Sequence, residues 1–271
     1  MMLFGVLGDP VSHSLSPAMH NAAFKAMGMD CEYHAFRVRT ENLEKALHGA
    51  SVLGFGGLNL TIPLKEKALE IVKPTELARQ IGAVNTVDLK EGMVGYNTDG
   101  IGAKMALYHN GIEVKGKKVL LLGAGGAARA IAFQLAKDGA SVTIANRSLD
   151  RADALARDVK KVGKVQASGY VDLKGLIQDS NILINSTSVG MYPKISETIV
   201  TSEMMHKDLV VFDIVYTPQS TMLLKEAKKA GAITIDGVMM LVFQGAESFK
   251  IWTGRTPPVD IMEKAVREKL E

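Results

Sequence analysis

Short apolar runs alternate with longer amphipathic stretches along the second half of the chain. The apolar runs predict strands at residues 119–122, 141–145, 182–185, 210–214 and 233–235, with a further short strand near Val165. Helices are expected between them. Strands that alternate with helices are typical of a parallel sheet with helices on both faces. The second half is therefore predicted to be a doubly wound α/β domain.

The first half also mixes strands and helices, but less regularly. Strands are expected at residues 3–7, 33–38, 56–60, 81–85 and 93–97, the last two joined by a turn at Glu91 and Gly92. Helices are expected at residues 17–27 with Ser16 as cap, at 41–50, from about Pro63, and at 100–110. Two closing helices are expected at 238–252 and 259–270, and their periodicity does not show which half they pack on.

The stretch from Val119 to Ala130 has the order strand, glycine turn, helix that a dinucleotide site needs. Gly123, Gly125 and Ala128 stand at the spacing G-x-G-x-x-A. The first position suits the tight turn, the second lets backbone approach a pyrophosphate, and the third lets the helix pack closely on the strand. The helix N-terminus directs free N–H groups at the phosphates. A glycine turn also occurs without a ligand, so the pattern needs further support.

That support comes from the end of the next strand. A site for NAD would have Asp or Glu there, whereas this chain has Asn146, Arg147 and Ser148. A carboxylate would repel a 2′-phosphate, and a guanidinium can bind one with two parallel hydrogen bonds. We therefore predict NADP as cofactor, with Arg147 facing the phosphate and Arg151 as a second candidate. The alternative for Arg147 is a solvated surface charge.

Composition and charge exclude several other functions. The 271 residues suit about two domains, and 47% hydrophobic residues argue against disorder. A net charge of +3 in mixed signs gives no reason to expect nucleic acid, and no run approaches the roughly 18 apolar residues of a membrane span. Cys31 is the only cysteine and no signal peptide is visible, so a cytoplasmic location is expected. The six histidines lack metal-ligand spacing, so no metal is expected.

Polar side chains cluster at expected strand ends and loops of the first half, where binding residues concentrate. They are Ser14, Ser16, Asn59, Thr61, Lys65, Asn85, Thr86, Asn97 and Asp99. Oxidation of an alcohol needs a group that accepts the hydroxyl proton. If a helix begins at Pro63, its dipole opposes the cation at Lys65 and makes the amine a better base. Asp99 either holds Lys65 or only caps the next helix.

Ser14 and Ser16 are separated by one residue. In an extended loop their hydroxyls would point the same way and bind a carboxylate together. The alternative is that they are turn and cap residues.

Several motifs together resemble the shikimate dehydrogenase family. They are GDPVSHSLSP, NLTIPLK, GAVNT, NTDG, GAGGAARA, ANRS, NSTSVGM at residues 185–191, DIVY at 213–216, and MLVFQGAESFKIWTG at 240–254. They cover nearly the whole chain in order, and their joint occurrence is highly specific. Leu60 and Leu64 stand where Val and His are frequent in the family, and both look like packing positions.

The resemblance implies reversible NADPH-dependent reduction of 3-dehydroshikimate to shikimate, a step of aromatic amino acid biosynthesis. It implies that Lys65 and Asp99 form the catalytic pair. The substrate-binding residues that it implies are Ser14, Ser16, Asn59, Thr61, Lys65, Asn85, Asp99, Tyr216 and Gln244. The cofactor-binding residues that it implies are Glu76, Gly123, Ala124, Gly125, Gly126, Ala127, Asn146, Arg147, Ser148, Ile214 and Gly237.

The resemblance also implies two domains. Residues 1–101 with 238–271 would form an α/β substrate-binding domain, and residues 102–237 a Rossmann-like NADP domain. The expected partner is a small-molecule substrate, with no nucleic acid and no membrane, in a monomer or a homodimer. A quinate/shikimate dehydrogenase that uses NAD is an alternative, against which Arg147 argues. A non-catalytic NADP-binding sensor is a more distant one, against which Lys65 and Asp99 argue.

Overall fold

The computed structural model describes residues 1–90 and 92–271, so Glu91, expected in a turn with Gly92, lies outside the described residues. The chain divides into two compact units, each built on its own six-stranded sheet. The first unit contains Met1–Gly102 and Leu241–Lys269, and the second contains Ala103–Met240.

The first unit has a mixed sheet with the strand order β2-β1-β3-β5-β6-β4. β1 is parallel to β2 and β3, whereas β5 is antiparallel to β3 and β6. The strands are β1 (Met2–Gly8), β2 (Cys31–Arg37), β3 (Gly57–Leu60), β4 (Lys73–Pro74), β5 (Thr86–Asp88) and β6 (Val94–Tyr96). The helices are α1 (Ser16–Ala26), α2 (Leu43–Val52), α3 (Glu76–Ile81) and α10 (Val259–Leu270), with 3-10 helices η1 (Thr40–Asn42) and η2 (Lys67–Glu70). The boundaries of the unit fall inside α4 (Asp99–His109) and α9 (Val238–Thr253).

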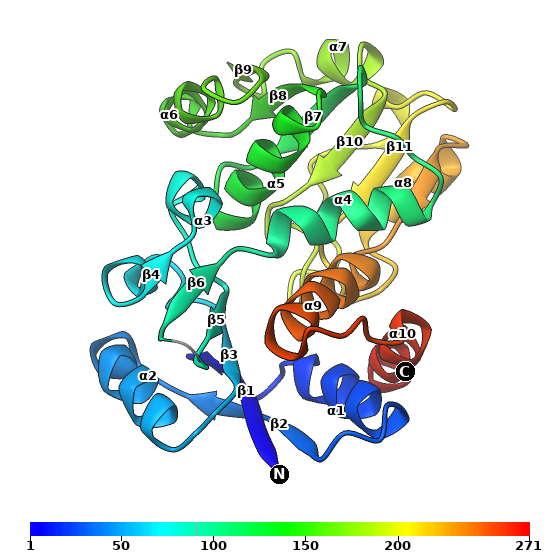
Figure 1. The fold of residues 1–271 in the computed structure, drawn as a ribbon. Helices are drawn as coiled ribbons and strands as arrows, with labels where there is room; N and C mark the ends of the chain where they lie inside the picture. The colour runs from blue at the N-terminus through cyan, green and yellow to red at the C-terminus, as the bar shows by residue number, and fades with distance from the viewer. Residues whose placement is uncertain (91) are drawn as a thin grey trace. The chain divides into compact units, whose positions relative to one another are not determined.

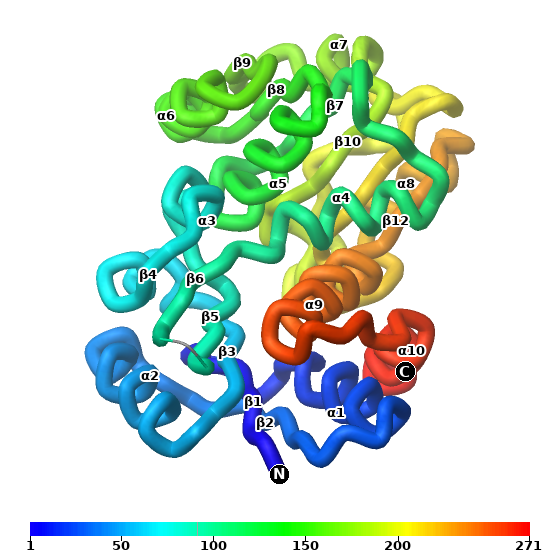
Figure 2. Tube along the Cα trace, in the orientation of Figure 1, coloured from blue at the N-terminus to red at the C-terminus, as the bar shows by residue number. Residues whose placement is uncertain are grey.

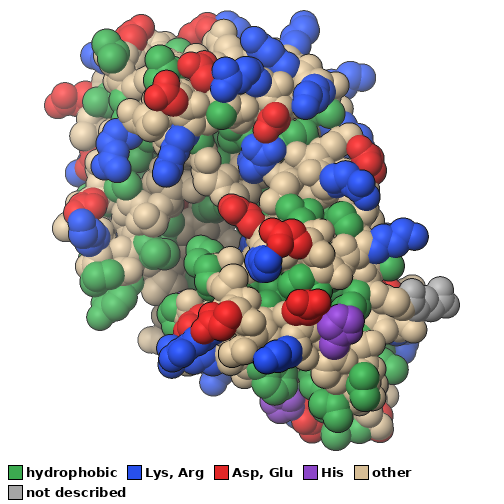
Figure 3. All heavy atoms as spheres, turned by 90° about the vertical axis from the view of Figure 1, so that its left-hand side faces the viewer, with side chains coloured by type: hydrophobic (Ala, Val, Ile, Leu, Met, Phe, Trp, Pro, Cys, Tyr) green, Lys and Arg blue, Asp and Glu red, His purple; other side chains and the backbone are tan. Residues whose placement is uncertain are grey.

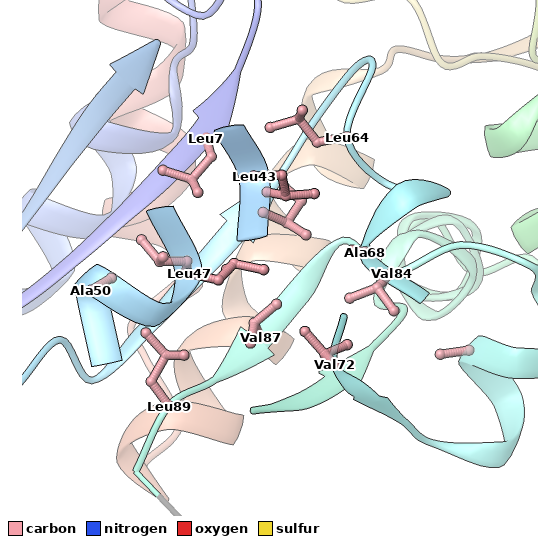
Figure 4. Close-up of a cluster of buried hydrophobic side chains, with 13 residues drawn as sticks. Leu7, Leu43, Leu47, Ala50, Leu64, Ala68, Val72, Val84, Val87 and Leu89 are labelled. Carbon is pink, nitrogen blue, oxygen red and sulfur yellow. The ribbon is translucent and has the colours of Figure 1, made fainter. Parts of the chain in front are cut away.

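Strand β1 is buried on both faces. Leu7 packs into a cluster with apolar side chains of α2 and η2, which Figure 4 shows in close-up. Phe4, on the opposite face, lies 5.3 Å from the Phe24 ring and 5.2 Å from the Trp252 ring. Alternation of side chains along a strand produces this division. Figure 1 accordingly shows α2 on one side of β1 and α1 and α9 on the other.

The second unit has an all-parallel sheet with the strand order β12-β11-β10-β7-β8-β9. Its strands are β7 (Lys118–Leu122), β8 (Ser141–Ala145), β9 (Lys164–Ser168), β10 (Ile182–Asn185), β11 (Val210–Asp213) and β12 (Ile233–Ile235). Its helices are α5 (Gly126–Lys137), α6 (Leu149–Val159), α7 (Leu173–Gln178), α8 (Met222–Lys229) and the 3-10 helix η3 (Ser202–Met204). Figure 2 traces this alternation from β7 to β12. The order, which runs outward from β7 in both directions, is that of a doubly wound dinucleotide fold, and the predicted fold class is confirmed.

The helix expected from Pro63 is wrong. Residues 62–66 form turns, and only the four-residue η2 follows. The Leu64 N–H donates to the Thr61 carbonyl at 2.8 Å, and the Lys65 carbonyl accepts from the Val84 N–H at 2.9 Å. The backbone of this segment thus makes hydrogen bonds within a turn and to a distant segment, and not the hydrogen bonds of a helix. No helix dipole from this segment therefore acts on Lys65.

Other boundaries also differ. The strand expected at residues 81–85 is wrong, because α3 ends at Ile81 and the strand is β5. Helix α3 was missed although its signals are present: the Thr75 hydroxyl caps it, and Gly82 ends it with φ 78°. Ser16 is the first residue of α1 and not its cap, which is Leu15. The short strand near Val165 is confirmed as β9.

The surface carries charges of both signs. On the face in Figure 3, Lys and Arg side chains lie interspersed with Asp and Glu. No helix in the described part of the chain combines the length and apolarity that crossing a bilayer requires. Among the same residues, no three His, Cys, Asp or Glu side chains converge as a metal site would need.

Candidate functional site

Lys65 and Asp99 form a close ion pair in the first unit. The Lys65 Nζ donates to Asp99 Oδ2 at 2.6 Å. The lysine side chain is 26% exposed and the aspartate 10%. The ammonium therefore keeps access to solvent, while the carboxylate is mostly covered. An ammonium carries three N–H donors, so Lys65 can bond Asp99 and a ligand together.

Asp99 is held by the start of α4 and by an amide. As the first residue of that helix it lies where the helix dipole stabilises negative charge. Its N–H donates to Asn97 Oδ1 at 3.1 Å, and its Oδ1 accepts from Asn85 Nδ2 at 2.8 Å. Each carboxylate oxygen thus has its own donor. Asp99 both begins the helix and holds Lys65, so the two interpretations of this residue are compatible.

Lys65 is positioned by its neighbours in the chain. Leu64 is fully buried in the apolar cluster of Figure 4, which anchors the turn from inside. The hydrogen bond from Val84 to the Lys65 carbonyl anchors it from the segment that leads to Asn85. Sequence reasoning therefore singled out Lys65 through a helix that the structure does not contain, and its catalytic role stays a prediction.

The side-chain amide of Asn85 is held in one orientation by Thr98 and Asp99. Its Oδ1 accepts from the Thr98 N–H at 2.8 Å, so its Nδ2 faces Asp99. Gln244 Oε1 lies 3.5 Å from the same Nδ2. The predicted residues Asn85, Asp99 and Gln244 are therefore brought together although they are far apart in sequence.

Asn59 extends the cluster toward the N-terminal loop. Its Oδ1 accepts from the Tyr33 hydroxyl at 2.7 Å. The Tyr33 hydroxyl is also hydrogen-bonded by the Ser16 side chain. Ser14 lies beside Ser16, whose N–H bonds the Ser14 Oγ at 3.3 Å. Both serines are thus placed in the same unit as the ion pair.

Thr61 and Glu76 also belong to the first unit. Thr61 follows β3, and its N–H donates to the Leu7 carbonyl at 2.9 Å. Glu76 is exposed at the start of α3 and accepts from Gln80 Nε2 at 3.0 Å. Neither is joined to the ion pair by the hydrogen bonds described above.

Sequence reasoning missed several residues of this cluster. Tyr33, Thr98 and Ser248 all lie buried within hydrogen-bond reach of Asn59 or Asn85. The sequence around Tyr33 indicates only a strand, although a buried tyrosine usually needs a partner for its hydroxyl. Ser248 stands one helical turn after Gln244, to whose carbonyl it donates at 3.0 Å.

The glycine turn of the second unit has the geometry of a phosphate-binding loop. Gly123 has φ 108°, and a Cβ there would lie 2.9 Å from Ser186 Oγ. A Cβ at Gly125 would meet no atom within 4 Å, so the space beside the N-terminus of α5 is open. Ala128 is fully buried where the helix packs on the sheet. Ala124, Gly126 and Ala127 complete the turn and the first helical residues, whose N–H groups the helix itself does not satisfy.

The segment after β8 carries an exposed cation. Arg147 is exposed, and the Asn146 side chain bonds the Ser148 carbonyl at 2.9 Å, which holds the turn. Burial raises the pKa of Tyr170, and the nearby charge of Arg147 acts in the opposite direction. An exposed guanidinium and an open helix N-terminus in one unit fit a phosphate-bearing dinucleotide.

A buried carboxylate holds the loop after β11. Asp213 accepts from Asn185 Nδ2 at 2.9 Å and from the Thr221 hydroxyl at 2.6 Å, and burial raises its pKa. The following residue, Ile214, has its carbonyl oxygen only 2.3 Å from where a Cβ of Gly237 would stand. Only glycine permits this approach. Burial also raises the pKa of Tyr216 in the same loop.

Family models of shikimate dehydrogenases match successive parts of the chain. Residues 6–87 match a family model described as shikimate dehydrogenase substrate binding domain, 104–240 one described as shikimate / quinate 5-dehydrogenase, and 237–267 one described as shikimate 5′-dehydrogenase C-terminal domain. The chain is 58% identical to the shikimate dehydrogenase (NADP+) of Methanosarcina barkeri, over 99% of both chains.

Solved structures are equally similar. A shikimate dehydrogenase in complex with NADP+ superposes with a TM-score of 0.95 at 47% identity, over 100% of this chain and 96% of the other. The enzyme of Thermus thermophilus, in complex with NADP(H) and shikimate, has a TM-score of 0.92 at 40% identity, over 100% of both chains.

Proposed function

This chain belongs to the shikimate dehydrogenase family, a family of oxidoreductases, and we propose that it catalyses the reversible reduction of 3-dehydroshikimate to shikimate with NADPH. The observation that carries the proposal is the Lys65–Asp99 pair at 2.6 Å beside the polar side chains that the family resemblance assigns to the substrate. Its place would be in aromatic amino acid biosynthesis.

The two units would divide the work. The first, Met1–Gly102 with Leu241–Lys269, would bind the substrate, and the second, Ala103–Met240, would bind NADP. The family models named for substrate binding and for the dehydrogenase match the corresponding parts of the chain, which supports this division. A cytoplasmic location and a monomeric or homodimeric state stay predictions from the sequence.

Lys65 would exchange the proton of the substrate hydroxyl. In reduction, its ammonium donates a proton to the oxygen of the ketone as that oxygen gains charge. In oxidation, the amine accepts the hydroxyl proton as the carbinol carbon loses hydride. The nicotinamide, when bound, supplies or accepts that hydride. Asp99 holds the Lys65 amine in place and balances its charge.

The remaining residues would fix one pose of the substrate. Ser14 and Ser16 would donate to the substrate carboxylate, and the ring hydroxyls would contact Asn59, Thr61, Asn85 and Gln244, with Tyr216 nearby. Positioning of this kind removes much of the entropic cost of the reaction.

The second unit would hold the cofactor through the glycine turn and Arg147. The open space at Gly125 supports close approach of a pyrophosphate, and the exposed Arg147 supports recognition of a 2′-phosphate. Asn146, Ser148, Ile214 and Gly237 would line the same cofactor, with Glu76 from the first unit as a further candidate.

Initial rates in four mixtures test the proposal: shikimate or quinate, each with NADP or NAD, followed by the absorbance of the reduced nicotinamide. We expect activity with shikimate and NADP. Comparable rates with quinate or NAD would assign the chain to the broader quinate/shikimate branch. Protein that binds NADP but turns over neither substrate would contradict the proposal and favour a sensor.

A further inference from the structure

We propose that Tyr33 and Ser248 are positioning residues of the candidate active site, and that both act through the side-chain amide of Asn59. The family resemblance assigns neither of them. The inference rests on the proposed function in taking Asn59 and Asp99 as groups that face the substrate.

The surroundings of Asn59 permit one orientation of its amide. Its Nδ2 lies 3.0 Å from the Asn85 carbonyl oxygen, which has no hydrogen to donate. A flipped amide would place Oδ1 against that oxygen, so that two acceptors would face each other in a buried site. Oδ1 must therefore face the Tyr33 hydroxyl, and Tyr33 must be the donor in the 2.7 Å bond.

Tyr33 is held firmly in this role, and its hydroxyl also meets the Ser16 side chain. Its side chain is fully buried, and its ring stacks on His20 at 4.4 Å with Trp252 at 6.2 Å. Burial raises the pKa of Tyr33 well above its ordinary value, so the hydroxyl stays a donor throughout the working range. Without that hydroxyl, the buried Asn59 oxygen loses the donor that fixes it.

Ser248 supports the other end of the same amide. The serine is fully buried in α9, and its Oγ lies 3.0 Å from Asn59 Nδ2 and 2.8 Å from Thr86 Oγ1. Its own hydrogen is shared by the Gln244 carbonyl at 3.0 Å and Thr86 Oγ1 at 2.8 Å. The Ser248 oxygen is therefore available to accept from Asn59, and the bond ties α9 to β3.

The amide passes its orientation on to Asn85, which we have proposed to contact the ring hydroxyls of the substrate. The Asn85 carbonyl takes one of the two Asn59 amide hydrogens, and Ser248 Oγ and Thr86 Oγ1, each 3.0 Å from Nδ2, share the other. The Thr86 hydroxyl in turn donates to Asn85 Oδ1 at 3.0 Å. Asn85 in turn donates to Asp99 at 2.8 Å. These buried bonds run in one direction from Tyr33 to Asp99. A rotated Asn59 would withdraw a donor from Thr86 and from the Asn85 carbonyl together.

The variant Tyr33→Phe tests this inference because it removes the hydroxyl that bonds Asn59. The same hydroxyl meets Ser16, so the effect through Asn59 is identified by comparison with Ser248→Ala, whose hydrogen bonds described above do not include Ser16. We expect the KM for shikimate to rise about 10-fold, the kcat to change by less than about 3-fold, and the KM for NADP to stay unchanged. A merely structural role would reduce the folded fraction, which lowers the apparent kcat without moving the KM. Tyr108→Phe, at a side chain that is 62% exposed, is the matched control.

Ser248→Ala gives an independent variant if Tyr33→Phe does not fold. It should also raise the KM for shikimate. Since both side chains act through one amide, the double variant should raise the KM by less than the product of the single effects.

The outcomes separate the inference from the function on which it rests. If the wild-type protein oxidises shikimate and both variants keep its KM, or if their effects multiply, the positioning role is overturned and the proposed function stands. If the wild-type protein is inactive on shikimate, the proposed function fails and the inference fails with it.

Discussion

Lys65 bonds the carboxylate of Asp99 and, in the proposed function, would also bond the hydroxyl of the substrate. The 2.6 Å bond to Asp99 and a side chain that is one quarter exposed leave it able to do both. The nearby Lys67 differs, because it is exposed on η2 and paired with Glu70. The two lysines therefore allow a comparison within one short segment.

We expect Lys65→Ala to lower kcat by about 10²–10⁴-fold, because proton transfer by a positioned group typically contributes that much. The KM for shikimate should change far less. Steady-state rates with shikimate and NADP measure both constants. Lys67→Ala is the control and should keep wild-type rates. An increase of KM alone in Lys65→Ala would show that the lysine only binds the substrate.

Arg147 is the residue proposed to distinguish NADP from NAD. Arg147→Ala should weaken NADP binding by about 10–100-fold, since charge-assisted hydrogen bonds to a phosphate are lost, and should leave NAD binding nearly unchanged. Titration of each cofactor by calorimetry measures this. Arg157→Ala, at an exposed arginine later in α6, is the control. Equal losses for NADP and NAD would mean that Arg147 does not contact the 2′-phosphate.

At the scale of elements, the glycine turn contains two glycines with different roles: Gly123 is needed for its backbone conformation, and Gly125 leaves space for a ligand. Gly123→Ala should lower the free energy of unfolding by about 1–3 kcal/mol, because φ 108° is unfavourable for alanine and the new Cβ would lie 2.9 Å from Ser186 Oγ. Gly125→Ala should leave stability within about 0.5 kcal/mol, since its backbone is extended and the space is open.

The same pair distinguishes folding from binding. Gly125→Ala should raise the KM for NADP, because the methyl group would stand where a pyrophosphate approaches the backbone. Chemical denaturation and cofactor kinetics on both variants are the measurements. A stable Gly125→Ala protein with a wild-type KM for NADP would show that the cofactor does not approach this position.

The segment around Pro63 shows the limit of reading elements from local sequence. Proline at a first helical position is a reasonable helix signal. Here the backbone instead bonds Thr61 locally and Val84 at a distance. No local pattern reveals the second bond. By contrast, α10 and the strands β8, β10 and β12 have the predicted bounds. In each of them the local pattern of apolar residues is enough to indicate the element.

At the scale of the whole molecule, His20 makes stability depend on pH. Its ring is fully buried among the rings of Tyr33, Phe24, Phe249 and Trp252, and neither ring nitrogen has a hydrogen-bond partner among the described residues. Burial lowers the pKa of His20 from 6.5 to about 3. Between pH 6.5 and 3, the His20 imidazole is therefore protonated in the unfolded chain but neutral in the folded chain. The free energy of unfolding falls as the pH falls through this range.

We expect His20→Leu to flatten this dependence. Below about pH 6, the free energy of unfolding of the wild-type protein should decrease more steeply than that of the variant, by up to about 1.4 kcal/mol per pH unit. Urea unfolding at several pH values measures the two slopes. His48→Leu, at an exposed histidine of α2, should keep the wild-type slope. Parallel slopes for the wild-type protein and His20→Leu would contradict the prediction.

The sequence by itself determined the doubly wound sheet, the glycine turn and the polar residues of the candidate site. Apolar periodicity, glycine spacing and short motifs each involve only a few neighbouring residues, so they can be recognised from the sequence without knowledge of the fold. The tertiary structure alone decided that Tyr33, Asn59 and Ser248 meet and that Asn85 faces Asp99. These hydrogen bonds join side chains far apart in sequence, and their direction is fixed only when all donors and acceptors are buried together.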